Sequence, residues 1–182
     1  MKEIIACICE GSAETAIIEI LLDHEFLIFN RDQLLDNEIL SQTYRNPKNF
    51  RRDYLIRQFE EDDELKVYLI VDRVTSFKIK EQISIKMTVE QIITKPEIEI
   101  LYIISVEKYN EYTTKYSSKM TPNEYIKRIL KIKDIKKYDF VKMHSSDIDF
   151  LIKTIIKYHS YKKSKNKDLL TLIRAEKIKG VR

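Results

Sequence analysis

The sequence predicts an α/β protein in which a mostly parallel, Rossmann-like sheet is flanked by helices and followed by a basic helical C-terminal extension. Two short, nearly unbroken apolar runs, Lys2–Cys9 and Lys66–Val71, are rich in β-branched residues. Such runs are typical of parallel strands that are covered on both faces. The first run is followed at once by apolar residues at helical spacing, which is how a βαβ unit begins. A chain of 182 residues can bury a core without disulfides or metals.

The first predicted unit joins a strand over residues 2–9 to a helix over residues 13–22. Ser12 suits the N-cap position of this helix, and Glu14 lies in its first turn, where the helix dipole favours an anion. Cys7 and Cys9 lie in the apolar strand, so we expect them to be reduced core residues.

The segment between the two strong strand patterns is less regular. Residues 26–29 predict a short second strand, and residues 31–59 predict polar helical structure that is interrupted at Asn46-Pro47. The acidic run 60–64 predicts a solvent-exposed loop.

Helices are expected to dominate the rest of the chain. Residues 77–93 are ambiguous and could contain a helix from about 84 to 92. Pro96 suits the first position of the next helix, whose apolar run 98–104 predicts burial on most sides. Further helices are predicted over residues 121–130, 147–158 and 167–176, the first of them opened by a Thr-Pro-Asn-Glu capping box.

Charge divides the chain into two parts. Residues 1–114 hold 14 Lys/Arg and 22 Asp/Glu, a net charge of −8, whereas residues 115–182 hold 19 and 7, a net charge of +12. We therefore expect an α/β core over residues 1–114 and a basic, mainly helical extension over residues 115–182 that packs on the same domain. The split suggests an acidic site beside a surface for a polyanion. A solvated lysine-rich face would explain the same counts.

The sequence also argues against several classes of protein. It has no Gly-x-x-x-x-Gly-Lys loop and no Gly-x-Ser-x-Gly elbow, which excludes P-loop nucleotide hydrolysis and disfavours a serine nucleophile. Its three histidines, His24, His144 and His159, have no metal-ligand or triad spacing. The N-terminal residues lack the charged-then-apolar pattern with a small-residue cleavage site, so we expect no leader, and no apolar run approaches the roughly 20 residues of a membrane span. We expect a cytoplasmic protein that makes no membrane contact.

The sharpest local pattern is Glu10-Gly11-x-x-Glu14, directly after the first strand. Glycine allows a tight turn after the strand. We expect Glu10 to project from the strand edge and Glu14, in the first helical turn, to reach the same opening at the end of the strand. Asp72 follows the later strand, at the carboxyl edge where open α/β sheets bind ligands. Carboxylates so placed can hold Mg²⁺, which takes one or two of them together with waters. The alternative is structural: Glu10 caps the helix start and Asp72 begins a turn.

This order of motifs resembles a small toprim (topoisomerase–primase) domain, of the variety found in bacterial defence nucleases of the overcoming-lysogenization-defect type and in their stand-alone relatives. The Pro-Glu-Ile-Glu segment 96–99 resembles the helix start of those relatives, and the resemblance covers roughly residues 1–110. In that family, acidic residues at these positions bind Mg²⁺ and act in phosphodiester cleavage or joining. The resemblance implies a toprim-like core with catalytic Glu10, Asp72 and Glu99. The implied Mg²⁺ ligands, for which Mn²⁺ may substitute, are these three with Glu14 and Glu97.

One departure from the family bears on the mechanism. The family commonly shows Asp-x-Asp after the later strand, whereas this chain has Asp72-Arg73-Val74. Either Glu97 or Glu99 then completes a one-metal site, or the domain binds without catalysing. Arg73 is a candidate for holding a scissile phosphate through its planar fork, and a salt bridge to a neighbouring carboxylate is its alternative role.

Two tyrosines lie among the lysines of the C-terminal tail. Aromatic rings between lysines can stack on bases while the lysines bind phosphates, although such tyrosines more often pack on the rim of a core. The candidate nucleic-acid-binding residues of the tail are Lys162, Lys163, Lys165 and Lys167, with Tyr158 and Tyr161 beside them.

The resemblance, taken with the acidic strand ends and the basic extension, implies a Mg²⁺-dependent nuclease of toprim type that acts on DNA or RNA, in defence against phage. The rival hypothesis is a catalytically degenerate toprim fold that binds nucleic acid or a partner, such as an associated ATPase or another defence protein. Either is compatible with an oligomer. A third hypothesis, a small-molecule enzyme on a flavodoxin-like sheet, lacks phosphate-cradling glycines.

Overall fold

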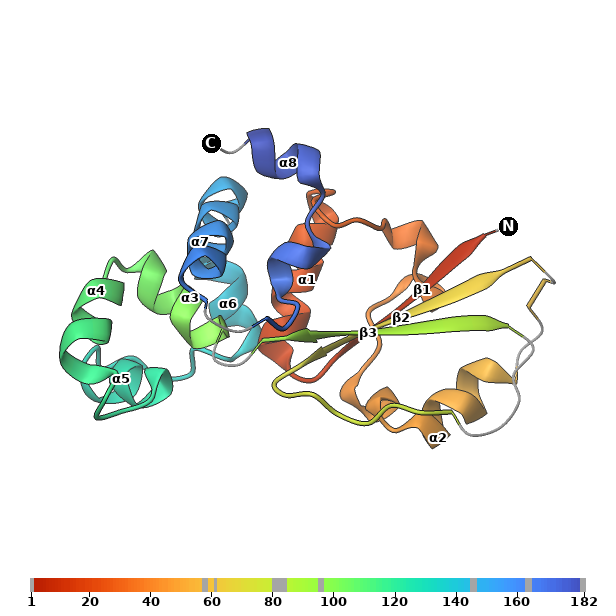
Figure 1. Cartoon of the computed structure of the whole chain (residues 1–182), viewed down its shortest axis with the longest axis horizontal. Coiled ribbons are helices and arrows are strands. Elements are labelled where there is room, and N and C mark those ends of the chain that lie inside the picture. The colour runs from red at the N-terminus through yellow and green to blue at the C-terminus, as the bar shows by residue number, and fades with distance from the viewer. Residues whose placement is uncertain are drawn as a thin grey trace.

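The computed structural model confirms the α/β class. It describes residues 2–56, 59–60, 62–79, 85–94, 97–144, 147–162 and 165–180. Within these residues the sheet has three parallel strands, β1 (Glu3–Cys9), β2 (Glu64–Val71) and β3 (Lys86–Ile93), in the order β1-β2-β3. Helices gather beyond the carboxyl ends of the strands, and the N-terminus lies at the other end of the sheet (Figure 1).

The apolar runs form β1 and β2 because their side chains are buried on both faces of the sheet. Along β1, Ile5, Cys7 and Cys9 belong to one hydrophobic cluster, and Ala6 and Ile8 belong to another. Parallel strands between two layers of cover show this alternation without a polar face. Both cysteines are buried and free, which confirms their predicted place in the core.

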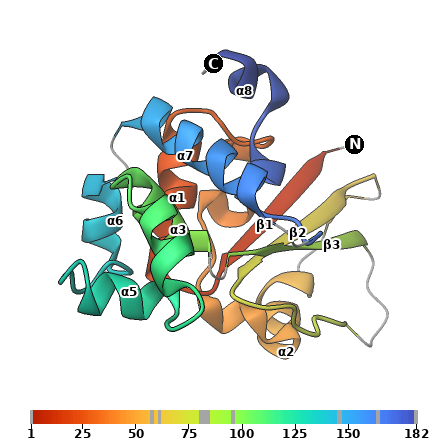
Figure 2. The ribbon, with the colours of Figure 1, turned by 60° about the vertical axis from the view of Figure 1, so that its left-hand side comes forward.

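The two hydrophobic clusters lie on opposite faces of the sheet. One cluster joins the sheet to α1 (Ser12–Asp23), α3 (Glu97–Ser105) and α7 (Ile148–Tyr161), with α6 (Tyr138–His144) packed on α1. The other contains Phe50, Tyr54 and Phe77 and includes the end of α2 (Pro47–Phe50). The sheet lies between α2 and α8 (Ala175–Gly180) in both Figure 1 and Figure 2. None of the described helices is long and apolar enough to cross a membrane.

The connection between α1 and β2 differs from the prediction. Residues 26–29 do not form a strand, because Leu27 makes only a single bridge, to Ile173. The polar stretch after them forms short helical turns (Arg31–Gln33, Leu35–Asn37, Gln42–Arg45), then α2 and a π-helical turn, Arg51–Leu55. Between these turns the chain runs along the outer side of β1: Leu34 makes a bridge to Ile5, and Leu40 N donates to Cys7 O at 2.8 Å. The outer edge of β1 is therefore partly covered.

The predicted helix at 84–92 is wrong: residues 86–93 form the strand β3. Residues 80–84 lie outside the described residues. β3 pairs with β2 along its whole length, and Ile92 is buried while Lys86 and Thr88 are exposed. Pairing with a neighbouring strand decides the structure here, because a short run of mixed residues has no strong helical or strand period of its own.

The helices after β3 follow the prediction more closely. α3 carries five buried aliphatic side chains in nine residues, as its continuous apolar run indicates. After α4 (Tyr109–Glu111) and a π-helical turn (Tyr112–Tyr116), α5 (Pro122–Arg128) begins with the predicted capping box: Thr121 N donates to Glu124 Oε2 at 2.9 Å. The Asp147 side chain caps α7 by accepting from Phe150 N at 3.0 Å.

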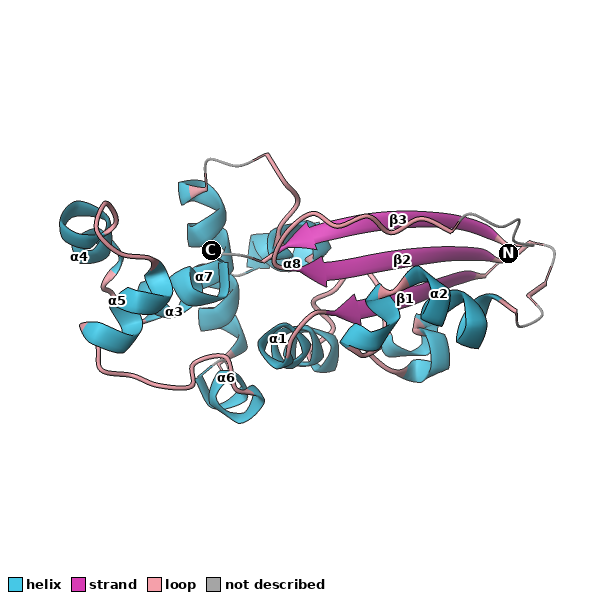
Figure 3. Cartoon of the chain, turned by 90° about the horizontal axis from the view of Figure 1, so that it is seen from below, coloured by secondary structure: helices cyan, strands magenta, loops and turns pink. Residues whose placement is uncertain are grey.

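The end of the chain packs back on the α/β core. The predicted helix over 167–176 is instead a 3₁₀ turn, Leu169–Leu172, followed by α8. Ile28 N donates to Leu172 O at 2.8 Å, and Ile93 N donates to Lys167 O at 2.9 Å. The C-terminal segment thus contacts both the edge strand β3 and the segment after α1, and the strands point toward the side of the molecule that holds α3, α5 and α7 (Figure 3).

Candidate acidic site

Glu10 and Asp72 meet at the carboxyl edge of the sheet. β1 and β2 end together, with Cys9 paired to Ile70, so the residues that follow them are neighbours. Glu10 N donates to Ile70 O at 2.9 Å, and Asp72 N donates to Glu10 Oε2 at 2.8 Å. The two strand-end acids therefore share one edge, and one carboxylate oxygen of Glu10 is held by the backbone N–H of Asp72.

A cavity opens at this edge. Its lining consists of Glu10, Gly11, Ser12, Ala13, Glu14, Asp72 and Lys136. Gly11 is the N-cap of α1, so the prediction that Ser12 is the cap is wrong. Instead Ser12 Oγ donates to the backbone oxygen of Lys136 at 2.9 Å. A Cβ atom at Gly11 would lie 2.7 Å from Glu14 Oε2, so the missing side chain makes room for the Glu14 carboxyl group.

Glu14 is the most buried acid of the cavity wall, with 4% of its surface exposed. Burial raises the pKa of its carboxyl group above the ordinary value, and the nearby charge of Asp72 raises it further. Thr94 Oγ1 donates to Glu14 Oε1 at 3.2 Å, and the attraction of Lys136 opposes the rise in pKa. Glu14 thus interacts with both Asp72 and Lys136.

Lys136 brings a positive charge among these acids. Its Nζ lies 3.1 Å from Glu99 Oε1, and the Glu99 side chain is only 6% exposed. Glu99 Oε2 is buried and has no hydrogen-bond partner among the described residues. Burial by itself would lower the pKa of Lys136, but the carboxylates of Glu99, Asp72 and Glu14 outweigh it and raise the pKa above its usual value.

A second cation, Arg45, pairs with the other oxygen of Glu10: its guanidinium lies 2.7 Å from Glu10 Oε1. Neither Arg45 nor Lys136 was identified from the sequence. Neither belongs to a recognisable sequence motif, both are far along the chain from the acids that they contact, and lysine is common throughout this sequence. The only local pattern around Lys136 is the run of isoleucines and lysines over residues 129–137, of which it is a member.

The donor atoms fit Mg²⁺ in kind, because carboxylate oxygens are its preferred protein ligands. The buried Glu99 Oε2, which lacks a partner among the described residues, is the kind of oxygen that a cation would satisfy. In the observed arrangement, however, no group of three or more His, Cys, Asp or Glu among the described residues could hold a metal ion. The side chain of Glu97 lies outside the described residues. Arg45 and Lys136, rather than a ready-made metal cage, balance the charge of Glu10 and Glu99.

The candidate nucleic-acid residues lie apart from one another. Arg73 is exposed directly after Asp72 at the cavity edge, whereas the other described candidates are on the tail. Lys162 is only 8% exposed in its side chain and pairs with Asp168 at 2.7 Å. Lys167 pairs with Glu90 at 2.9 Å, and Lys165 is exposed. The last tail candidate, Lys163, lies outside the described residues.

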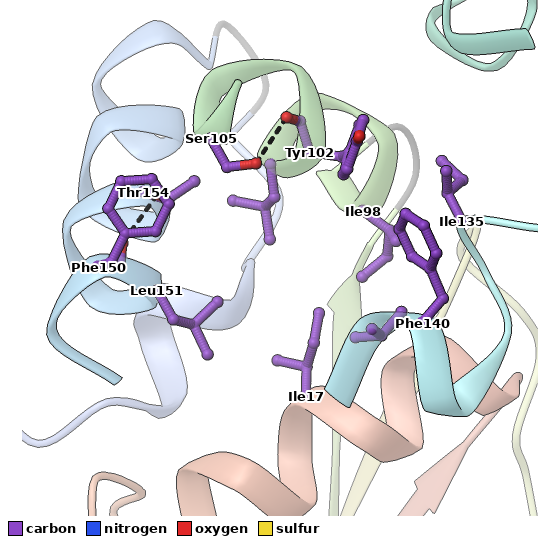
Figure 4. Close-up of a pocket in the computed structure, with 11 residues that line it drawn as sticks. Ile17, Ile98, Tyr102, Ser105, Ile135, Phe140, Phe150, Leu151 and Thr154 are labelled. Carbon is purple, nitrogen blue, oxygen red and sulfur yellow. Dashed lines mark hydrogen bonds between the residues drawn. The ribbon is translucent and has the colours of Figure 1, made fainter. Parts of the chain in front are cut away.

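A separate apolar pocket lies between α1, α3, α6 and α7 (Figure 4). Its volume is about 40 Å³, and the hydroxyl groups of Ser105 and Thr154 are satisfied within their own helices: Ser105 donates to Tyr102 O and Thr154 to Phe150 O, both at 2.8 Å. The pocket therefore lacks the convergent polar groups of a specific binding site. This pocket adjoins the acidic cavity along the chain, because Ile135 lines the pocket and the next residue, Lys136, lines the cavity.

None of the protein-family models, curated proteins or solved structures compared with this chain matches it. No family is therefore assigned on similarity. The functional argument rests on the residues of the acidic cavity and on their positions at the carboxyl edge of a parallel sheet.

Proposed function

We propose that the acidic cavity is the active site of a metal-dependent nucleic-acid phosphodiesterase of toprim type. The observation that carries the proposal is the convergence of Glu10, Glu14 and Asp72, from two strand ends and one helix start, on a single cavity. Ligands of open α/β sheets bind at this edge, and acidic residues gather there in phosphoryl-transfer sites that use Mg²⁺.

Each residue has a proposed role in this site. Asp72 is a metal ligand, and Glu10 is a ligand or the general base, with one oxygen oriented by Asp72 N–H. Glu99, or Glu97, supplies a further ligand, and Glu14, which lines the same cavity as Glu10 and Asp72, is another. Mg²⁺ bound there would neutralise charge that develops on the phosphate and activate a water molecule.

The substrate in this proposal is DNA or RNA, and the physiological role is defence against phage, alone or with an ATPase or another defence protein. Arg73 is exposed beside Asp72, where its planar fork can hold a phosphate. The excess of basic residues in 115–182 supports attraction of a polyanion.

The rival function is a toprim-like module that binds nucleic acid or a partner protein without cleavage. Two observations favour it. The ion pairs Arg45–Glu10 and Lys136–Glu99 already balance two of the acids, and the second aspartate after β2 is replaced by Val74.

The substitution Glu10→Gln separates the two functions. In the nuclease, it abolishes Mg²⁺-dependent cleavage of single-stranded DNA, double-stranded DNA or RNA. The melting temperature changes little, since Gln can still accept the Asp72 N–H bond and the lost pair with Arg45 is partly exposed and worth about 1 kcal/mol or less. Glu176→Gln, an exposed acid on α8, is the matched control and retains full cleavage. If wild type cleaves none of these substrates and gains no stability from Mg²⁺ or Mn²⁺, the binding module is the better account.

A further inference from the structure

The outer edge of β3 has no neighbouring strand among the described residues. β2 lies between β1 and β3, and the outer side of β1 is partly covered by the segment that contains Leu34 and Leu40. Among the described residues, only Lys167 makes a backbone hydrogen bond beyond β3, and it accepts from Ile93 at the very end of the strand. Figure 3 shows β3 along the outside of the sheet, on the side away from β1. The part of β3 that precedes Ile92 is therefore an open strand edge.

The backbone bonds at the end of β3 show which of its residues point outward. Ile93 N donates outward to Lys167 O at 2.9 Å, and Thr94 N donates inward to Val71 O of β2 at 2.9 Å. Successive residues of a strand point their backbone groups to opposite sides, so the odd-numbered residues of β3 share the direction of Ile93. Among the described residues, no backbone partner reaches the outward N–H and C=O groups of Met87, Val89 and Gln91.

The charges on β3 are arranged symmetrically about Thr88. A row of unpaired N–H and C=O groups is a template for another strand, and charged side chains often block such an edge. β3 carries two charges of opposite sign, Lys86 and Glu90, at equal spacing on either side of the exposed Thr88 and on the same face of the sheet. If a second copy of β3 lies antiparallel with the twofold axis at Thr88, Lys86 of each copy faces Glu90 of the other. Such opposed residues have Cα atoms about 4.5 Å apart.

The same register satisfies the open backbone groups. It places Met87 of one copy opposite Val89 of the other, and because both residues point outward, they exchange backbone hydrogen bonds on each side of the axis. The neighbouring register, with its axis at Val89, also joins outward residues. It would, however, place Lys86 opposite Ile92 and lose both charge pairs. Charge therefore selects the axis at Thr88.

The ion pairs already present on each copy extend this match. Lys86 Nζ contacts Glu64, and Lys167 Nζ lies 2.9 Å from Glu90 Oε2. The side chains of Lys86 and Lys167 are 71% and 51% exposed, so both are surface pairs that remain accessible to a further partner. Across the axis the charges would follow one another as Glu64 and Lys86 of one copy, then Glu90 and Lys167 of the other. Signs alternate along this row, so no like charges are neighbours in it.

We propose that β3 pairs antiparallel with β3 of a second copy of this chain, about a twofold axis at Thr88. The two three-stranded sheets then form one continuous sheet, and the contact uses the same surface on both copies. This inference does not depend on the proposed function, because the acidic cavity is lined by residues that follow β1 and β2 and by Lys136, and no β3 residue lines it.

The first test is sedimentation equilibrium of charge variants of the intact chain. Lys86→Glu leaves only acids on this edge and Glu90→Lys leaves only bases, so like charges face each other in both homodimers. Each variant alone should dimerise at least about tenfold more weakly than wild type. An equimolar mixture restores opposite charges at both positions and should form a heterodimer about as tight as the wild-type dimer. Lys153→Glu, at an exposed position on α7, is the control and should dimerise as wild type does.

The second test removes an outward backbone donor. Val89→Pro lacks the N–H that faces the second copy, whereas the bonds to β2 come from the even-numbered residues, and proline is tolerated at such edge positions. It should be monomeric with a cooperative melting transition. Val89→Ala loses part of the same side chain but keeps the N–H, and should remain a dimer.

Three results would overturn the proposal. They are a wild type that stays monomeric at every concentration, a dimer that none of the variants at residues 86, 89 and 90 weakens, and a mixture of Lys86→Glu and Glu90→Lys that associates no better than either variant alone. Association that returns on mixing cannot come from misfolded variants, so the mixture decides the question even where Val89→Pro fails to fold.

Discussion

At the scale of single residues, the acidic cavity depends on a close fit between Gly11 and Glu14. Gly11 has an extended backbone conformation that any residue can adopt, so its small size rather than its flexibility matters here. The Glu14 carboxyl group fills the space that a side chain at this position would take. As a result, a carboxyl group lies in the wall of the cavity with little contact to water, and its ionised form is disfavoured.

Glu14→Gln should change how stability depends on pH. Burial raises the pKa of Glu14 in the folded protein above its unfolded value of 4.5. The folded state therefore binds more protons than the unfolded state just above pH 4.5, and stability from this group is full below that pH and is lost as pH rises through the folded pKa. We expect Glu14→Gln to have a higher melting temperature than wild type at pH 8 and little advantage at pH 4.

Melting curves from pH 4 to pH 8 measure this difference. The exposed Glu176→Gln is the control for a general change in net charge and should show no such pH-dependent offset. A constant offset between Glu14→Gln and wild type at every pH would contradict the assignment of a raised pKa to Glu14.

At the scale of elements, β3 supports the site although it contributes no acid to it. Gln91 on β3 makes two hydrogen bonds to the backbone of Thr75, one as donor and one as acceptor, both at 2.8 Å. This pair holds the segment that follows Asp72 against the sheet. In the predicted helix over residues 84–92, Gln91 would lie on a helix surface. Its contact with Thr75 could therefore not be predicted from the sequence.

Gln91→Ala should loosen the segment after β2. Loss of two partly buried hydrogen bonds costs about 1–3 kcal/mol of unfolding free energy. The amide of Thr75 should also exchange with solvent faster, which hydrogen exchange measures directly. Gln42→Ala, at an exposed position, is the matched control and should change neither quantity. Unchanged exchange at Thr75 in Gln91→Ala would show that other contacts hold the segment.

At the scale of the whole molecule, the C-terminal segment ties the basic part of the chain to the α/β core. Asp168 is fully buried. Its Oδ2 lies 2.8 Å from Nδ1 of His159, which is on α7, and 2.7 Å from Nζ of Lys162, which follows α7. Beyond it, Arg174 donates to Leu27 O next to the segment after α1. Residues 115–182 thus pack with residues 1–114, and part of their positive charge serves this packing.

Asp168→Asn should destabilise the whole protein. It leaves the ammonium of Lys162, which is 8% exposed, without its carboxylate, and loss of one member of a buried pair costs about 3–5 kcal/mol. Asp149→Asn, an exposed acid in the first turn of α7, is the control and should cost about 1 kcal/mol or less. Urea unfolding measures both. A loss below about 1 kcal/mol for Asp168→Asn would mean that the pair is not needed to hold the segment.

The sequence alone determined the elements whose patterns are local. Continuous β-branched runs identify β1 and β2, a continuous apolar run identifies α3, and the Thr121 capping box marks the start of α5. It also placed Glu10 and Asp72 at one edge, because residues that follow parallel strands emerge on the same side of a sheet.

Only the tertiary structure decided the features that depend on contacts across the chain. β3 is a strand because β2 offers it a partner, and residues 169–172 form a 3₁₀ turn beside the buried Asp168 rather than a continuous helix. Arg45 and Lys136 reach Glu10 and Glu99 only once the sheet and helices have packed. Electrostatic pairing depends on distance in space rather than on spacing along the chain. No sequence pattern therefore predicted the two cations that balance the negative charge of this site.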